Sequence, residues 1–331
     1  MNLAMLLEMA ADELGERVAF GGLDDGISFE ALRQMASASL PRATHCGTIA
    51  LAAPNGPEVP VTLFSAVWSG LSYAPVNYRL PPSSLAQLVE TLRPDVLVCA
   101  KTVGSSLDEL GEGVASMRRP SSEQWLSERA GAEAHAGFAE HPQGPAVILF
   151  TSGTSAAPKA ATLQHEHLLS YVWNTTEFAS ADADEAVLLA APPFHVAGVV
   201  GVLTSCYAGR RVVPLPSFSA TSWLKTVREE SVTNAFVVPT MLSRIVAVME
   251  SDPEARVPSM RSLTYGGARL PLPVLERAME LLPDTGFVNA YGLTETSSTV
   301  SILGPDDHRE AAASRDPRLR RRLESAGRPI P

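Results

Sequence analysis

The stretch Ala146-Val-Ile-Leu-Phe-Thr-Ser-Gly-Thr-Ser-Ala-Ala-Pro-Lys-Ala160 changes character halfway along. Its first five residues are apolar, as in a buried strand, and a loop of small side chains follows that ends in Pro158 and Lys159. Small residues let backbone N–H groups approach an anion, and Lys159 supplies positive charge. Further donors are the hydroxyl groups of Thr151, Ser152, Thr154 and Ser155. The stretch therefore predicts a phosphate-binding loop at the end of a buried strand.

The nearest generic pattern for this loop is the Walker A motif, G-x-x-x-x-G-K-[ST]. Gly153 and Lys159 have its spacing. However, Pro158 replaces the second glycine, and Ala160 replaces the hydroxyl residue that binds magnesium. The loop therefore argues against a P-loop NTPase. Taken by itself, it could also be a surface turn rich in Ser and Thr.

A second polar segment, Val288-Asn-Ala-Tyr-Gly-Leu-Thr-Glu-Thr296, also follows an apolar run. It places an aromatic ring, a glycine, a hydroxyl group and a carboxylate within one short loop. Ligands of open α/β sheets bind at the carboxyl ends of the strands. This segment is therefore expected to face the same ligand as the first loop.

Short apolar runs bounded by turn residues alternate with amphipathic segments along the chain. The expected strands are Thr48–Ala52, Val96–Cys99, Ala146–Phe150, Val187–Ala190, Val212–Pro214, Ala235–Val238, Leu263–Tyr265 and Phe287–Asn289. The expected helices are Glu58–Trp68, Ser83–Leu92, Thr240–Glu250 and Leu272–Leu282. The alternation predicts an α/β fold of layered parallel sheets with helices on both faces.

The stretch 111–144 has little hydrophobic pattern and is rich in Gly, Ser, Ala, Arg and Glu. Such a stretch is typical of a connection between packed units. We therefore expect a soft division there, between a first α/β unit at 1–110 and a second at 145–300. Residues 301–331 are expected to lead toward a further part of the protein.

The composition indicates a globular protein that acts on small molecules. Of the 331 residues, 45% are hydrophobic and 19% charged, and the net charge is −10. An acidic chain is a poor partner for nucleic acid or an anionic membrane surface. The longest uncharged stretch, 186–209, is interrupted by Pro192, Pro193 and His195, so no integral membrane segment is expected. Three cysteines and an N-terminus without a signal-peptide pattern favour a cytoplasmic location.

Five motifs together resemble the adenylate-forming superfamily of acyl-CoA synthetases, non-ribosomal peptide adenylation domains and firefly-type luciferases. They are TSGTSAAPK at 151–159, APPFHVAG at 191–198, TYGGARL at 264–270, NAYGLTE at 289–295 and AGRP at 326–329. They occur in the family's order. The chain resembles the acid–CoA ligase branch, and within it the large N-terminal domain.

The resemblance implies that a carboxylic acid attacks the α-phosphate of ATP and that a thiol, here coenzyme A, captures the acyl-adenylate. The 151–159 loop, including Gly153, is then expected to hold the β- and γ-phosphates, and Tyr291 to pack against adenine. Thr294 is expected to donate to the α-phosphate, and Glu295, together with Thr154, to hold Mg²⁺. The other residues assigned to the nucleotide are Gly266, Gly267, Ala268, Arg269, Asn289, Ala290 and Gly292.

The resemblance also implies that His195 lies in the acyl pocket, near the entry of the thiol, and is a catalytic candidate. Amino-acid-activating relatives usually carry Asp in this region, so an amino acid substrate is disfavoured. Apolar walls with few polar groups suit a fatty, aryl or other hydrophobic acid. The other residues expected in this pocket are Val196, Val199, Val200, Pro239, Thr240, Gly267 and Leu293.

Several alternatives stay open at this point. The acceptor could be a carrier-protein thiol, the chain could be a non-catalytic nucleotide-binding module, and a homodimer is compatible with the sequence. Ala156 and Ala160 stand where the family usually has glycine, which predicts a stiffer loop. The family's ribose-binding Asp and C-terminal Lys are expected beyond Pro331, so we expect this chain alone to adenylate poorly.

Overall fold

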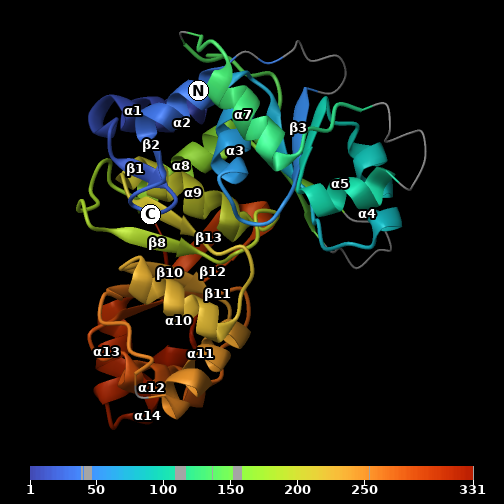
Figure 1. Cartoon of the computed structure of the whole chain (residues 1–331). Coiled ribbons are helices and arrows are strands. Elements are labelled where there is room, and N and C mark those ends of the chain that lie inside the picture. Colours follow the sequence, from blue (N-terminus) through green and yellow to red (C-terminus); the bar gives the residue numbers. More distant parts are fainter. Residues whose placement is uncertain are drawn as a thin grey trace.

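The computed structural model describes residues 1–38, 40, 47–108, 117–135, 137–151, 159–252 and 254–330. Within these residues the strands form two sheets (Figure 1). One has nine strands in the order β14-β13-β12-β11-β10-β8-β9-β1-β2, and the other has five in the order β5-β3-β4-β6-β7. Both sheets are mainly parallel and are flanked by helices, so the predicted α/β fold class is confirmed.

The five-stranded sheet lies in the first half of the chain. Its strands are β3 (Thr48–Ala52), β4 (Ser72–Pro75), β5 (Val96–Cys99), β6 (Val147–Thr151) and β7 (Lys159–Leu163). Four strands run parallel, and β7 returns antiparallel beside β6 with Thr151 opposite Lys159. Its helices are α3 (Glu58–Trp68), α4 (Pro82–Leu92), α5 (Lys101–Asp108) and α7 (Ser122–Gly131).

The nine-stranded sheet combines the N-terminus with the second half of the chain. Its parallel strands are β1 (Val18–Phe20), β8 (Ala186–Leu189), β9 (Arg211–Pro214), β10 (Asn234–Val237), β11 (Ser262–Gly266) and β12 (Gly286–Leu293). Antiparallel strands complete both edges, namely β2 (Ile27–Ser28), β13 (Ser298–Leu303) and β14 (Arg328–Pro329).

Helices and short turns connect and cover the strands of this sheet. The longer helices are α1 (Ala4–Leu14), α2 (Phe29–Ser37), α8 (His165–Thr175), α9 (Val196–Ala208), α10 (Ala220–Glu229), α11 (Pro239–Ser251), α12 (Leu272–Leu281) and α13 (Pro305–Ala313). Shorter turns are η1 (Thr294–Thr296), α14 (Pro317–Arg320) and η2 (Arg321–Glu324).

The strand pairing does not follow the division expected at 111–144. Strand β6, which lies after this stretch, pairs with β4 before it, and β1 near the N-terminus pairs with β9. The units 1–110 and 145–300 therefore do not correspond to separate sheets. The stretch also holds α7, which packs against α2 and α3 and buries Trp125 completely. Its few apolar residues that pack against the core, Trp125, Leu126 and Phe138, are too widely spaced to form a clear pattern in the sequence.

Residues 290–293, which follow the expected strand Phe287–Asn289, are predicted to form a loop, but they continue β12. They pair antiparallel with β13, with a bulge between Tyr291 and Gly292. A side chain at Gly292 would place its Cβ 1.7 Å from the carbonyl oxygen of Ser298. This close approach needs glycine. The turn proper begins only at Thr294, in η1.

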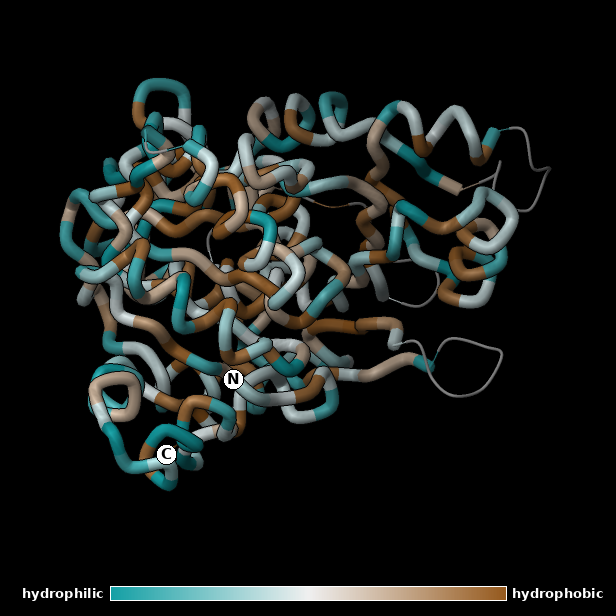
Figure 2. Tube along the Cα trace, turned by 90° about the horizontal axis from the view of Figure 1, so that it is seen from below, coloured by the Kyte–Doolittle hydropathy of each residue, from teal (hydrophilic) through white to brown (hydrophobic). Residues whose placement is uncertain are grey.

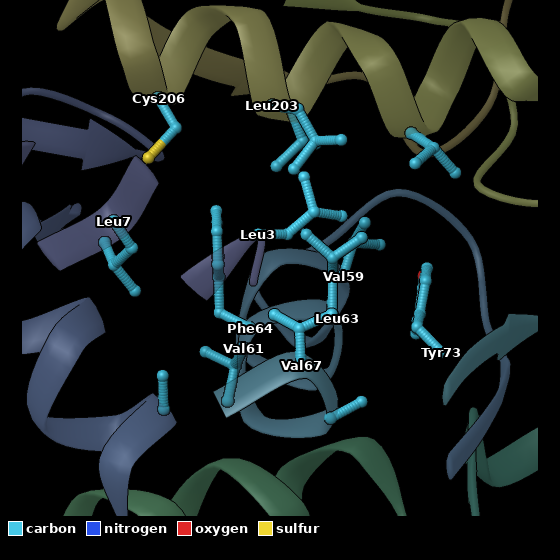
Figure 3. Close-up of a cluster of buried hydrophobic side chains, with 14 of the residues drawn as sticks. Leu3, Leu7, Val59, Val61, Leu63, Phe64, Val67, Tyr73, Leu203 and Cys206 are labelled. Carbon is cyan, nitrogen blue, oxygen red and sulfur yellow. The ribbon is translucent and has the colours of Figure 1, made fainter. Parts of the chain in front are cut away.

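The largest core lies between the two sheets, around α3. All residues of α3 are buried, as expected for a helix packed on every side. Figure 3 shows Leu63 and Phe64 of this helix near Leu3 at the N-terminus and Leu203 of α9. Cys206 of α9 is buried in the same cluster as a free thiol.

Hydrophobic stretches run through the middle of the molecule, and hydrophilic residues gather on its outer turns (Figure 2). Among the helices of the described ranges, none is long and apolar enough to cross a bilayer.

Candidate active site

Two segments that the sequence assigned to a nucleotide line one pocket of about 390 Å³. Residues 266–270 follow β11, residues 289–293 form the end of β12, and residues 323–326 close a third side. Adjacent parallel strands end at the same sheet edge, which brings the first two segments together. We call this cavity the β11–β12 pocket.

Two glycines shape the wall of the β11–β12 pocket. Gly267 has a φ angle of 80°, which L-residues rarely adopt. A Cβ at Gly266 would lie 2.2 Å from the carbonyl oxygen of Ala290 and 3.5 Å from the ring of Phe236. Glycine at these positions lets the two strand ends approach each other and keeps the pocket open.

A buried hydrogen-bonded pair supports the floor of this pocket. The Tyr265 hydroxyl lies 2.9 Å from Nε2 of His308, whose Nδ1 lies 2.8 Å from the carbonyl oxygen of Gly304. Because a carbonyl only accepts, Nδ1 carries the proton and Tyr265 donates to Nε2. Burial raises the pKa of Tyr265 and lowers that of His308, so both groups are neutral at pH 7. No motif in the sequence marks His308.

The C-terminal segment is fastened to the same pocket. Asn289 donates a hydrogen bond of 2.8 Å from Nδ2 to the carbonyl oxygen of Ser325. Arg269 forms an ion pair with Glu324 at the surface. The side chain of Arg269 is largely exposed, so this pair adds little stability. Tyr291 and Leu293, both 53% exposed, lie at the pocket's rim.

The turn that carries Thr294 and Glu295 packs against β7, the strand that begins at Lys159. The structure therefore brings the turn at Thr294–Thr296 next to the strand that begins at Lys159. The positions of Ser152, Gly153, Thr154 and Ser155, like those of Ala156 and Pro158, lie outside the described residues. The strand ends Thr151 and Lys159, which flank this loop, are paired in register.

Glu295 suits a magnesium ion that is shared with phosphates. Its carboxylate is exposed and has no ion-pair partner in the part of the chain that the structure describes. Across the same residues, no group of three or more metal-ligating side chains occurs. Magnesium at nucleotide sites is commonly held by one or two carboxylates plus substrate phosphates. The exposed carboxylate of Glu295 therefore fits the kind of single protein ligand that such an ion would need.

His195 precedes α9 and belongs to a row of aromatic rings. Its ring centroid lies 4.7 Å from that of Phe194, which in turn lies 5.7 Å from that of Tyr78. Burial lowers the pKa of His195, and the positive charge of Arg79 lowers it further. His195 is therefore neutral at pH 7 and can accept a hydrogen bond.

A cavity of about 640 Å³ adjoins this aromatic row. Its lining includes Tyr78, Pro192 and two arginines, Arg79 and Arg244. We call it the Arg79 pocket. No motif in the sequence marks either arginine, although Arg79 follows β4 closely and so lies near a carboxyl end of the sheet.

The residues predicted for an apolar acyl pocket do not share one cavity. Thr240 lines the Arg79 pocket, Gly267 and Leu293 line the β11–β12 pocket, and Pro239 is buried at the start of α11. Along α9, Val199 packs into the core, and Val196 contacts the same cluster. These residues are therefore divided among several cavities and the core, and their role in one acyl pocket stays a prediction. Adjacent residues of a helix, such as Val199 and Val200, face different directions.

The opposite face of α9 lines a further cavity of about 320 Å³, which we call the α9 pocket. Ala197, Val200, Gly201 and Thr204 line it at the spacing of one helix face. Strands β10 and β11 form its floor, and Ala290 of β12 also lines it. Because Ala290 lines both cavities, the α9 pocket and the β11–β12 pocket are neighbours.

Comparison with known proteins agrees with this architecture. A family model described as AMP-binding enzyme matches residues 8–331. The chain is 28% identical over 282 residues to an indoleacetate–CoA ligase of Aromatoleum aromaticum, which covers 82% of this chain and 54% of the relative. It is 33% identical over 192 residues to a 2-succinylbenzoate–CoA ligase of Bacillus licheniformis, covering 57% and 36%. The chain thus spans about half the length of such relatives.

Solved structures show the same fold. The N-terminal domain of FACL13 from Mycobacterium tuberculosis matches with a TM-score of 0.82 at 21% identity, over 99% of this chain and 82% of that one. The O-succinylbenzoate coenzyme A synthetase from Bacillus subtilis, in complex with AMP, matches with a TM-score of 0.77 at 23% identity, over 98% and 80%.

Proposed function

Because the chain belongs to the AMP-binding enzyme family, we propose that it carries the nucleotide and acid sites of an acid–CoA ligase. In the proposed reaction a carboxylic acid attacks the α-phosphate of ATP, pyrophosphate leaves, and coenzyme A captures the acyl-adenylate. The identified relatives act on different acids, as their names show, so the family does not by itself fix the substrate.

One observation carries this proposal, namely the junction of the α9 pocket with the β11–β12 pocket. Ala290 lines both cavities, and it pairs with Gly266, whose missing side chain lets the two strands approach closely at this point. An acid in the α9 pocket can therefore bring its carboxylate to a nucleotide in the β11–β12 pocket. Positioning two reactants in neighbouring sites is a major source of rate enhancement.

Within this proposal, Tyr291 stacks on adenine at the pocket rim, and the 151–159 loop holds the terminal phosphates. Thr294 donates to the α-phosphate from η1, next to β7. Magnesium, held by Glu295, would neutralise charge on the phosphoryl oxygens as pyrophosphate leaves.

The Arg79 pocket is the proposed approach of the acceptor thiol. Two guanidinium groups, Arg79 and Arg244, give it the positive charge that a phosphate-bearing acceptor requires. Neutral His195, beside this pocket, can accept a hydrogen bond from the incoming thiol. Coenzyme A and a phosphopantetheine carrier share this chemistry, and acyl transfer to each acceptor by the longer protein distinguishes them.

Titration of the chain with AMP by calorimetry tests the nucleotide site. We expect Tyr291→Ala to weaken AMP binding about tenfold, because stacking of a base on an aromatic ring is worth on the order of 1–3 kcal/mol. Tyr291 is half exposed, so its removal leaves the core intact. The matched control is Trp173→Ala, an exposed aromatic residue on α8. Equal AMP affinity of Tyr291→Ala and the unsubstituted chain would contradict the placement of adenine in this pocket.

A further inference from the structure

The α9 pocket has a polar floor, although a helix covers it. Ser262 and Thr264 of β11 line the pocket, whereas Leu263 and Tyr265 on the other face are buried in the core. Successive side chains of a strand point to opposite faces. Parallel strands covered on both sides are usually apolar on both faces. The polar face of β11 is therefore not explained by packing.

The hydroxyl groups of Ser262 and Thr264 have no hydrogen-bond partner among the residues that the structure describes. By contrast, the hydroxyl of Thr204, on the helix side, donates 2.7 Å to the carbonyl oxygen of Val200. Ser262 and Thr264 are half-buried, so a molecule in the pocket can reach them. Each hydroxyl can both donate and accept a hydrogen bond.

An ion pair with balanced charge lies at the end of the pocket where β10 begins. Nε of Arg210 donates 2.8 Å to Oε2 of Glu185, and Nδ2 of Asn234 donates 3.2 Å to the same oxygen. Arg210 and Asn234 line the pocket. Because Glu185 already balances the charge of Arg210, a second buried carboxylate would find no net positive charge here.

The opposite end of the pocket lies at Ala290, which pairs with Gly266 of β11. On β11, Thr264 and Ser262 lie two and four residues before Gly266. At about 3.3 Å per residue, their distances from the junction are about 7 Å and about 13 Å. A carboxylate at the junction therefore places the far end of a short acid beside these hydroxyls.

We infer that the α9 pocket selects a carboxylic acid that carries an uncharged oxygen group, such as a hydroxyl, at the end away from the reacting carboxylate. This inference rests on the proposed function, since it requires the carboxylate to lie at Gly266. The inferred acid belongs to a narrower class than the fatty, aryl or other hydrophobic acid expected from the sequence. A plain alkyl or aryl acid leaves the hydroxyls of Ser262 and Thr264 covered and unpaired, which a site built for hydrogen bonds disfavours.

Calorimetry with acyl-sulfamoyl adenosines tests the inference on the 331-residue chain. The matched pairs are benzoyl with para-hydroxybenzoyl and cinnamoyl with para-hydroxycinnamoyl, and para-carboxybenzoyl is the charged comparison. We expect the hydroxylated member of at least one pair to bind about tenfold more tightly than its partner. The para-carboxybenzoyl compound is expected to bind no more tightly than benzoyl.

Substitution at the floor identifies the residues responsible. In the double variant Ser262→Ala with Thr264→Val, the hydroxylated and plain members of a pair are expected to bind with nearly equal affinity. The affinity for the benzoyl compound is expected to stay unchanged. The control Thr226→Val changes the same side chain on α10, outside the α9 pocket, and is expected to keep the preference.

AMP is titrated in parallel so that two kinds of failure can be told apart. If AMP binds but both members of every pair bind equally, or the double variant keeps the preference, the inference is wrong and the nucleotide site stands. If AMP does not bind either, the proposed function fails and the inference fails with it.

Discussion

At the scale of single residues, backbone requirements were easier to predict than side-chain directions. Gly266 and Gly267 were assigned from a motif, and the structure shows why glycine is needed there, namely a close approach to Ala290 and a positive φ angle. Val199 was assigned to a pocket but packs into the core. A list of apolar residues does not state which helix face each one occupies, so the acyl pocket could not be derived in this way.

The burial of His165 also predicts that the stability of the folded chain depends on pH. Its Nδ1 accepts a hydrogen bond of 3.1 Å from the backbone of Leu3, and burial lowers its pKa to about 4. The folded state therefore binds a proton less readily than the unfolded chain, whose His pKa is about 6.5. The stabilisation from neutral His165 is complete above about pH 6.5 and is lost as the pH falls toward 4.

We expect the free energy of unfolding to fall more steeply between about pH 6.5 and pH 4 in the unsubstituted chain than in His165→Gln. The difference should approach about 3 kcal/mol, since one unit of pKa corresponds to about 1.4 kcal/mol. Urea unfolding across this pH range measures it. The exposed His141→Gln serves as the control. Parallel curves for His165→Gln and the unsubstituted chain would contradict the assignment.

At the scale of elements, long or strongly apolar segments were predictable and short edge elements were not. Helix α3 and strands β3 and β5 have the predicted bounds. Strand β7 has three exposed residues, and β13 has only one buried residue, so neither shows the apolar run that identifies a buried strand. Because β13 went unrecognised, the end of β12 was interpreted as a loop. Whether such a segment forms an antiparallel edge strand depends on its pairing in the folded structure rather than on its own sequence pattern.

The β12–β13 pair makes a specific prediction at Gly292. Gly292→Ala places a methyl group in conflict with the carbonyl oxygen of Ser298, at 1.7 Å before relaxation. We expect a loss of about 1–3 kcal/mol of stability, as for other overpacked sites, together with weaker AMP binding because the pocket rim shifts. Gly304→Ala is the matched control, since a Cβ there meets no atom within 4 Å. Unfolding curves of both variants check this, and equal stability would rule out the conflict.

At the scale of the whole molecule, each sheet combines strands that lie far apart in the sequence. The pairing of β1 with β9 and of β4 with β6 joins segments that lie far apart in the chain. The fold class followed from alternating strands and helices, but strand order depends on which faces are buried together. The residues of the β11–β12 pocket could be predicted from the family resemblance. The α9 pocket and its polar floor could be recognised only from the three-dimensional packing.

The central claim is that an acyl-adenylate spans the β11–β12 pocket and the α9 pocket through the junction at Ala290. A crystal structure of the chain with para-hydroxybenzoyl-sulfamoyl adenosine tests it most directly. The account predicts adenine beside Tyr291, the linkage next to Gly266, and the hydroxyl within hydrogen-bond distance of Thr264 or Ser262. An acyl group in the Arg79 pocket, or an empty α9 pocket with the nucleotide bound, would contradict it.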